Sequence, residues 1–255
     1  DDYDLSIETV YKTVVFHAPA DATGNISVTI GNKTYAAQLA NGTAKITVPE
    51  LVDGVNNVVI SYSGDDKYAS RSYSSNITIE TKIIAADMTR GYNSGLDYQF
   101  KVVDINGNPI TNKDVKVRIN DKEYTVRTDS DGVAKLNVKL AVGTYSVVII
   151  NPGSGKAVNK TLNIVKRFTG NKNLVKYYNS KYRYKFRVIG DDGNPVGEGV
   201  KVKVIIGKTA YMLKTDKNGY ITIKLSYKFT HKKYNIRAYY KGDVIRNVIT
   251  IKQIS

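Results

Sequence analysis

Basic side chains alternate with aromatic or apolar ones in segment 181–188. The odd positions hold Lys181, Arg183, Lys185 and Arg187, and the even positions hold Tyr182, Tyr184, Phe186 and Val188. Successive side chains of a β-strand point to opposite faces, so this segment predicts a strand with one basic face and one core face. Lys224 and Lys228 lie on a strand that we expect to share the sheet, while Lys201, Lys203, Arg237 and Lys241 should face outward from the opposite sheet.

Two interpretations fit these cations. The row could bind a polyanion, because a concentrated positive field attracts acidic polymers. It could equally be a solvated face, on which lysines prevent edge-to-edge aggregation. Four tyrosines that could stack on sugars, Tyr177, Tyr178, Tyr182 and Tyr239, are also open to a plain packing role.

Catalytic constellations are absent from the sequence. The chain has no cysteine, and its two histidines, His17 and His231, fall in its first and last thirds. Neither a histidine-based metal site nor a Ser-His-Asp arrangement can therefore be assembled within one domain. We expect a protein that is not an enzyme and that uses no metal and no cofactor.

Two aspartate-rich segments suggest calcium at first sight. They are Asp129-Ser-Asp-Gly132 and Asp216-Lys-Asn-Gly219, and both lack the later acidic ligands of a calcium loop. Because each lies between two predicted strands, we interpret both as hairpin turns in which glycine supplies the positive φ. Asp104-Ile-Asn-Gly-Asn-Pro109 has the same interpretation.

The sequence also contains residues that could carry two kinds of covalent modification. Five segments fit the N-glycosylation pattern, slightly more than such a composition gives by chance, with acceptors Asn25, Asn32, Asn41, Asn76 and Asn159. A Lys–Asn cross-link would need a lysine, an asparagine and a carboxyl group together in the core. We disfavour it, because Lys101 and Lys185 are predicted to point outward.

The elements that carry these residues are predicted to be strands. The chain is rich in Val, Ile, Thr and Tyr, and no segment has a sustained helical apolar period. Residues 81–166 and 167–252 are two copies of one unit: Tyr98-Gln-Phe-Lys-Val aligns with Tyr184-Lys-Phe-Arg-Val, 86 residues later. In the third domain we expect seven strands, and Leu140-Ala-Val-Gly-Thr-Tyr145 predicts a tyrosine corner.

Domains of about 85 residues divide the chain into three, each able to hold its own core. The boundaries are 1–80, 81–166 and 167–255. The first domain has 5 Lys+Arg and 10 Asp+Glu, the second has 13 Lys+Arg and 8 Asp+Glu, and the third has 20 Lys+Arg and 5 Asp+Glu. The domain charges are therefore −5, +5 and +15, so the first is acidic and the third strongly basic. The fold class predicted is all-β, with three tandem immunoglobulin-like β-sandwich domains in an extended array, because the junctions lack Gly, Ser or Pro tracts. The rings expected in the repeat cores are Tyr98, Phe100, Tyr145, Tyr184, Phe186 and Tyr234.

Several segments resemble known repeat families. Gly24-Asn-Ile-Ser-Val-Thr-Ile30 and Tyr62-Ser-Gly-Asp-Asp-Lys-Tyr68 look like the bacterial-type Ig-like repeat. The Asp-Gly-Asn-Pro, Thr-Asp-x-x-Gly and Gly-Thr-Tyr-x-Val segments of the later domains resemble the Ig-like repeats of adhesin-like surface proteins of methanogenic archaea. The resemblance covers almost the whole chain, but these turn and core motifs specify a fold and no ligand. Segment 226–234 departs from the pattern by replacing the short Gly-Thr-Tyr entry.

The resemblance implies an extracellular, cell-surface fragment of a larger anchored protein. We expect a non-catalytic adhesin-like stalk that gives reach and multivalent contact with a host or neighbouring-cell surface. One alternative is a module for a cell-wall polymer or acidic glycan centred on the basic third domain, and another is the stalk of a wall-processing enzyme. Nucleic acid is disfavoured as a partner, no stretch of about 18 apolar residues could span a membrane, and we expect a monomer.

Overall fold

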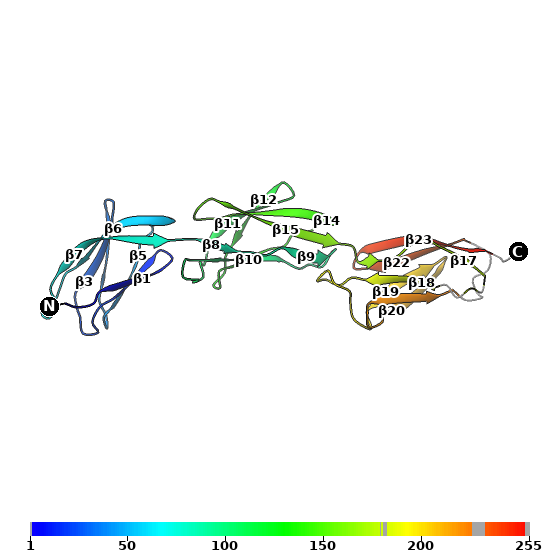
Figure 1. Cartoon of the computed structure of the whole chain (residues 1–255), viewed down its shortest axis with the longest axis horizontal. Helices are drawn as coiled ribbons and strands as arrows, with labels where there is room; N and C mark the ends of the chain where they lie inside the picture. The colour runs from blue at the N-terminus through cyan, green and yellow to red at the C-terminus, as the bar shows by residue number, and fades with distance from the viewer. Residues whose placement is uncertain (1, 179, 181–182, 226–232, 253–255) are drawn as a thin grey trace. The chain divides into compact units, whose positions relative to one another are not determined.

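The computed structural model describes residues 2–178, 180, 183–225 and 233–252 (Figure 1). Every regular element within these residues is a β-strand, which confirms the all-β prediction. In the described part of the chain, no helix has the length and hydropathy to cross a membrane.

The first sandwich pairs a three-stranded sheet with a four-stranded one, in the orders β1-β2-β5 and β4-β3-β6-β7. Its strands are β1 (Ser6–Val10), β2 (Thr13–His17), β3 (Asn25–Ile30), β4 (Lys33–Gln38), β5 (Thr43–Thr47), β6 (Gly54–Tyr62) and β7 (Arg71–Ile79). Alternation along these strands sends Phe16, Ile26 and Ile60 into one shared core, in which none of the three is exposed.

The second set of strands forms the sheets β13-β10-β8 and β12-β11-β14-β15-β9. The strands are β8 (Lys82–Ile84), β9 (Met88–Gly91), β10 (Tyr98–Val103), β11 (Asp114–Ile119), β12 (Lys122–Arg127), β13 (Val133–Leu136), β14 (Gly143–Ile150) and β15 (Ala157–Val165). Strand β10 pairs with β8, and β11 pairs with β12 and β14, all antiparallel, whereas β9 pairs with β15 in parallel over Met88–Gly91.

The third set repeats this arrangement, with the sheets β16-β18-β21 and β17-β23-β22-β19-β20. Its strands are β16 (Phe168–Thr169), β17 (Leu174–Tyr177), β18 (Arg183–Val188), β19 (Lys201–Ile206), β20 (Thr209–Lys214), β21 (Tyr220–Lys224), β22 (Lys233–Tyr240) and β23 (Asp243–Lys252). The parallel pair is now β17 with β23. The described residues of this set form eight strands instead of the seven predicted, because the two residues of β16 are too few to show an alternating pattern.

This strand order is that of tandem immunoglobulin-like β-sandwiches. In each set one sheet has three strands. The other sheet contains a hairpin (β3-β4, β11-β12 or β19-β20) together with the last strand of the set (β7, β15 or β23). The second and third sandwiches share one topology including the parallel pair, which confirms that the sequence repeat is a structural repeat. The first sandwich differs: its opening strand β1 and closing strand β7 lie in different sheets.

Most of the rings predicted for the cores are buried. Tyr98, Phe100, Tyr184 and Phe186 are at most 3% exposed. The prediction was wrong for Tyr145 and Tyr234, which are only half-buried. Both stand near the starts of their strands, where the end of a sandwich leaves a ring partly uncovered. Tyr145 does form the predicted corner, because its hydroxyl donates to the carbonyl of Ala141 at 2.8 Å.

The backbone separates into two compact units. The first contains Asp1–Ala86, Gln99–Leu136 and Val147–Lys160, and the second contains Asp87–Tyr98, Asn137–Ser146 and Thr161–Ser255. The residues of the middle repeat are thus divided between the units, and the boundaries 1–80, 81–166 and 167–255 stay a proposal. The basic residues on β18 and β21 and the surroundings of Arg90 all belong to the second unit.

Candidate polyanion-binding face

The predicted basic row is built by β18 and β21. Arg183 and Lys185 are exposed and Arg187 is half-buried, while Tyr184, Phe186 and Val188 between them are buried. The strand register is therefore the predicted one. Lys181 and Lys228, also assigned to the site, lie outside the described residues.

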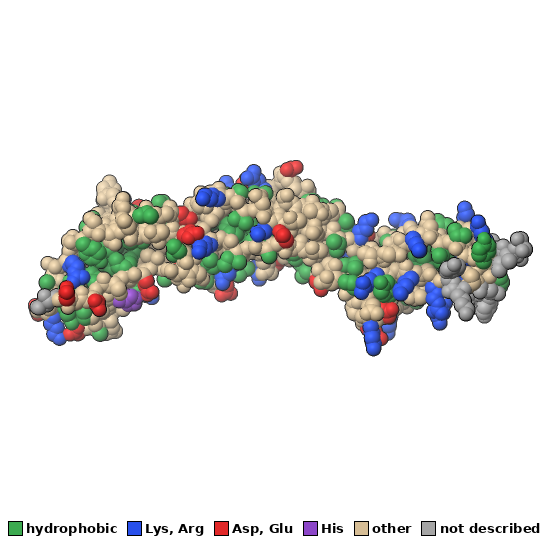
Figure 2. All heavy atoms as spheres, in the orientation of Figure 1, with side chains coloured by type: hydrophobic (Ala, Val, Ile, Leu, Met, Phe, Trp, Pro, Cys, Tyr) green, Lys and Arg blue, Asp and Glu red, His purple; other side chains and the backbone are tan. Residues whose placement is uncertain are grey.

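Pairing with β21 adds a fourth cation to this face. Arg183 lies opposite Lys224, Lys185 opposite Thr222, and Arg187 opposite Tyr220. Side chains of directly opposed residues share a face, so Arg183, Lys185, Arg187 and Lys224 form one surface, here called the basic row. Figure 2 shows Lys and Arg side chains gathered over the part of the chain that ends at the C-terminus.

Tyr220 holds two members of the basic row in place. The Lys185 Nζ lies 4.0 Å from the centroid of its ring, and the Arg187 Cζ lies 4.9 Å from it, both suitable for cation–π contacts. Arg187 also donates from Nε to the carbonyl of Asn218 at 2.7 Å. The sequence analysis did not select Tyr220, although its place directly after the Gly219 turn sets it opposite Arg187.

The charges of the basic row are not neutralised by ion pairs. Among the described residues, no carboxylate lies within salt-bridge distance of Arg183, Lys185, Arg187 or Lys224. The pKa of Asp216 is lowered chiefly by the backbone N–H of Tyr220, and the charges of Lys185 and Arg187 lower it further. These cations are thus left to attract anions from solution.

A small hollow adjoins the row. It has a volume of about 160 Å³, and its lining includes Lys172, Leu174, Arg183, Lys185 and Tyr220. Lys172, which is exposed, therefore adds a positive charge beside the row next to Leu174 of β17. A space of this size accepts a single functional group, not a whole small-molecule ligand.

The equivalent face of the second sandwich is nearly neutral. Sequence alignment of the repeats places Asp97, Gln99, Lys101 and Asn137 where the third sandwich has Arg183, Lys185, Arg187 and Lys224. Val133 stands in the position of Tyr220. The second and third sandwiches have the same fold, although only the third has the four cations, so the basic row is not needed for folding.

The opposite sheet of the third sandwich is also basic. Lys201 and Lys203 are exposed and Arg237 is half-buried, which confirms their outward direction. Lys241 is exposed too, but it lies in the turn between β22 and β23 and not on the sheet as predicted. Arg237 lies directly opposite Arg246, a like-charge pairing that costs stability unless an anion lies between the two side chains. This sheet extends the positive field around the sandwich.

The tyrosines proposed for stacking are dispersed. Tyr177 is 50% exposed on β17, whereas Tyr178 is half-buried. Tyr239 lies on β22, two strands away from β17 in the same sheet, and Lys203 Nζ is 5.9 Å from its ring centroid. Tyr182 lies outside the described residues, so the described rings form no single platform.

The two aspartate-rich segments are turns, but the prediction that they close hairpins was wrong. Each turn leads from one sheet to the other, because β12 and β13 lie in different sheets and so do β20 and β21. Asp216 Oδ1 accepts hydrogen bonds from the backbone N–H groups of Asn218 and Tyr220, both at 2.9 Å. Asp129 accepts the same two bonds in the second repeat. Gly132 and Gly219 have φ of 74° and 83°, which side chains other than hydrogen rarely tolerate. The carboxylates are used to close the turns.

The other predicted modification sites are accessible. The side chains of all five sequon asparagines are exposed: Asn25, Asn32, Asn41, Asn76 and Asn159. Of the lysines expected to avoid a Lys–Asn cross-link, Lys185 is exposed and Lys101 is half-buried. His17 contacts Glu8 at 2.8 Å on the surface of the first sandwich, and His231 lies outside the described residues.

Sequence analysis missed a pair of buried cations. Arg90 on β9 and Lys176 on β17 are 5% and 1% exposed, and they occupy equivalent positions in the two repeats. Arg90 donates to the carbonyls of Leu96 and Val138, while Lys176 donates to those of Ser180 and Leu225 at 3.1 and 2.7 Å. Burial lowers the pKa of both side chains. The repeated spacing Arg90-x-Tyr-Asn-Ser and Lys176-x-Tyr-Asn-Ser was the available signal.

The chain matches no protein-family model and no curated protein. Among solved structures it is similar to a Ca²⁺-stabilized adhesin that helps an Antarctic bacterium bind ice, with 15% identity, a TM-score of 0.27, and coverage of 100% of this chain and 74% of that chain. A titin domain tandem gives 9% identity, a TM-score of 0.39, and coverage of 98% and 100%. A Bacteroides ovatus protein of a mixed-linkage glucan utilization locus, in complex with a heptasaccharide, gives 11% identity, a TM-score of 0.27, and coverage of 99% and 71%. These TM-scores are below 0.5, so the fold assignment rests on the strand order.

Proposed function

We propose that this chain is a non-catalytic, adhesin-like surface segment whose third sandwich binds an acidic cell-wall polymer or glycan. The observation that carries the proposal is the basic row: four cations on one sheet face, two of them held by Tyr220, with no ion-pair partner among the described residues. Tandem repeats of one sandwich suit adhesion because several weak contacts combine into a strong one.

The spacing of the row suits a linear polyanion. Side chains two residues apart on a strand are about 6.6 Å apart, and neighbouring strands are about 4.8 Å apart. Arg183, Lys185 and Arg187 therefore present charges at regular intervals along β18, and Lys224 adds a charge on the neighbouring strand β21. A polymer with repeated acidic groups can contact several of these cations at once, whereas a single small anion cannot.

The surface location is supported by two features of the chain. The Ig-like segments resemble adhesin-like surface repeats, and the five sequon asparagines are exposed. An exposed asparagine is what a glycosylation enzyme requires. Extracellular acidic glycans or wall polymers are therefore the class of polyanion that we propose.

The decisive experiment exchanges the row for the residues of its sister repeat. In the full chain, Arg183→Asp, Lys185→Gln and Lys224→Asn introduce the residues found at the equivalent positions 97, 99 and 137. We expect this variant to keep its melting temperature and to lose most of its binding to immobilised dextran sulfate, a polyanion without uronic acids, and to purified wall material. Binding of the parent chain should weaken steeply with salt, because charges at the surface are screened within about 8 Å at 0.15 M.

A matched control separates a site from net charge. Lys201→Asp, Lys203→Gln and Lys214→Asn change the net charge by the same amount on the opposite sheet of the same sandwich. This control should retain most of the binding. Equal losses in both variants, or no saturable binding of the parent chain at 0.15 M salt, would contradict the proposal.

A further inference from the structure

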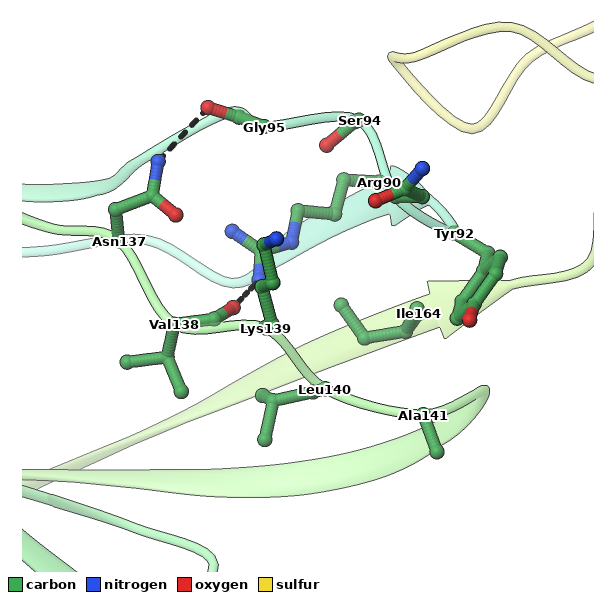
Figure 3. A pocket seen from close by; sticks show the side chains of 11 residues that line it. Arg90, Tyr92, Ser94, Gly95, Asn137, Val138, Lys139, Leu140, Ala141 and Ile164 are labelled. Carbon is green, nitrogen blue, oxygen red and sulfur yellow. Dashed lines mark hydrogen bonds between the residues drawn. The ribbon is translucent and has the colours of Figure 1, made fainter. Parts of the chain in front are cut away.

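A pocket lies beside the buried side chain of Arg90, in the second sandwich and apart from the basic row. Its volume is about 380 Å³, which is within the usual range of small-ligand sites. Two loops line it, residues 92–95 after β9 and residues 137–141 after β13, and the side chain of Ile164 on β15 completes the wall (Figure 3).

Arg90 is a buried cation without a counter-ion. It is 5% exposed, its described hydrogen bonds go to two backbone carbonyls, and no carboxylate of the described residues pairs with it. Burial lowers the pKa of its guanidinium, and the charge of Asp97 offsets this only in part. Because burying an unpaired charge is costly, an anion that enters the pocket gains a strong interaction.

The guanidinium can take such an anion. It has five N–H donors, and the carbonyls of Leu96 and Val138 engage its two terminal nitrogens. Arginine binds planar carboxylates through two parallel hydrogen bonds. Lys139, which is exposed and also lines the pocket, supplies a second positive charge.

The remaining polar groups fit hydroxyls better than further charge. Asn137 donates from Nδ2 to the carbonyl of Gly95 at 2.9 Å, so its Oδ1 is left as an acceptor. Ser94 Oγ accepts from the backbone N–H of Leu96 at 3.1 Å, so its own proton can be donated. In the view of Figure 3, Asn137 lies beyond the guanidinium end of Arg90, and Ser94 lies above the aliphatic part of its side chain.

Apolar surface fills the rest of the lining. Tyr92, Leu140 and Ile164 contribute a ring and two aliphatic side chains. Sugar-binding sites combine such surface with a few placed polar groups that fix orientation. A phosphate would instead favour a cluster of backbone N–H groups, whereas backbone carbonyls point at the cation here.

We propose that this pocket binds a uronic acid residue, with Arg90 and Lys139 holding its carboxylate and Asn137 and Ser94 contacting its hydroxyls. The proposal does not depend on the basic row, which lies on the third sandwich. The chain would then have two sites: the basic row for a polymer and this pocket for a single sugar residue.

Titration calorimetry of the full chain with sodium galacturonate tests the proposal. The methyl ester of galacturonic acid and free galactose are uncharged counterparts of the probe and should bind at least about tenfold more weakly, the effect of losing a charge-assisted hydrogen bond. Equal binding of galacturonate and its methyl ester, or no saturable binding of galacturonate, would overturn the proposal. So would a clear preference for tetraglutamate, which offers carboxylates without sugar hydroxyls.

Two variants locate the site. Lys139→Gln should weaken galacturonate binding by about tenfold, whereas Lys135→Gln, an exposed lysine on β13 outside the pocket, should not. Truncation of Arg90 could unfold the two loops, so the second variant is Arg90→Lys, which introduces the residue found at the equivalent buried position 176. Lysine cannot bind a carboxylate through two parallel hydrogen bonds, so this variant should also bind galacturonate more weakly. Unchanged affinity in both pocket variants would refute the assignment. The triple variant of the basic row should bind galacturonate normally, which separates this site from the proposed function.

Discussion

Asp65 illustrates how single carboxylates hold the loops of these sandwiches. Its side chain accepts hydrogen bonds from the backbone N–H groups of Thr23, Lys67 and Tyr68 at 2.7, 2.8 and 2.7 Å. These bonds, that from Thr23 foremost, lower the pKa of Asp65 to about 2. A carboxylate in this role stabilises the fold only while it is ionised.

This geometry makes the acid stability of the first sandwich depend on Asp65. Because the folded pKa of about 2 lies below the ordinary value of 3.8, the stabilisation is complete above pH 3.8 and is lost as the pH falls toward 2. Asp65→Asn should lower stability at neutral pH and make the acid limb of the unfolding profile shallower, as followed by circular dichroism. Asp66→Asn, at an exposed neighbour, is the control, and an unchanged acid limb in Asp65→Asn would contradict the prediction.

At the residue scale, the sequence predicted side chains whose direction follows from strand alternation. Arg183 and Lys185 face outward and Phe186 inward, as a period of two requires. Arg90 and Lys176 could not be predicted in this way, because alternation alone does not show that a cation will meet backbone carbonyls at the end of a sandwich. Tyr220 was missed because its role depends on the pairing of β18 with β21.

At the element scale, β18 separates a core face from a surface face within two residues. Phe186 is fully buried, with ring centroids of Phe168 and Tyr184 at 5.4 and 5.8 Å, whereas Lys185 is exposed. Phe186→Ala should lower the free energy of unfolding of the third sandwich by about 3 to 5 kcal/mol. Lys185→Ala should change it by less than about 0.5 kcal/mol. Chemical denaturation measures both, and similar effects at the two positions would show that the register is shifted by one residue.

The tyrosine corner of β14 gives a second test at this scale. The Tyr145 hydroxyl donates to the Ala141 carbonyl, which joins the start of the strand to the preceding loop. Tyr145→Phe removes only this bond and should cost about 1 kcal/mol of unfolding free energy. Tyr124→Phe on β12, where no hydroxyl bond is described, is the control. Equal losses in the two variants would argue against a role of the corner in stability.

Turn chemistry and alternation made most elements predictable from the sequence. Asp and Gly at 129–132 and 216–219 marked the turns between strands, although not that each turn passes from one sheet to the other, and the 86-residue repeat indicated that two sandwiches share one topology. The short β16 could not be predicted, since a two-residue bridge has no pattern. The half-exposure of Tyr145 and Tyr234 depends on where each sandwich ends, which no local pattern reports.

At the scale of the whole molecule, separate cores should make stability local. Phe16 belongs to the core of the first sandwich and Phe186 to that of the third, and the two clusters share no residue. Phe16→Ala should speed amide exchange in the first sandwich only, and Phe186→Ala in the third only, as measured by hydrogen-exchange mass spectrometry. In the double variant the two effects should add, because residues that belong to separate cores and share no partner do not couple. Faster exchange in both sandwiches after one substitution would contradict this.

The parallel strand pairs determine how the sandwiches respond to tension. Four residue pairs join β9 to β15, and four join β17 to β23, so in the second and third sandwiches the second strand is directly bonded to the last one. Pulling on the chain draws two parallel partners along their axes in opposite directions, which loads all of their hydrogen bonds together as a clamp. The first sandwich has no such clamp, because β1 and β7 lie in different sheets. In single-molecule stretching it should yield at the lowest force, so that under drag it lengthens first while the basic sandwich stays folded and able to bind.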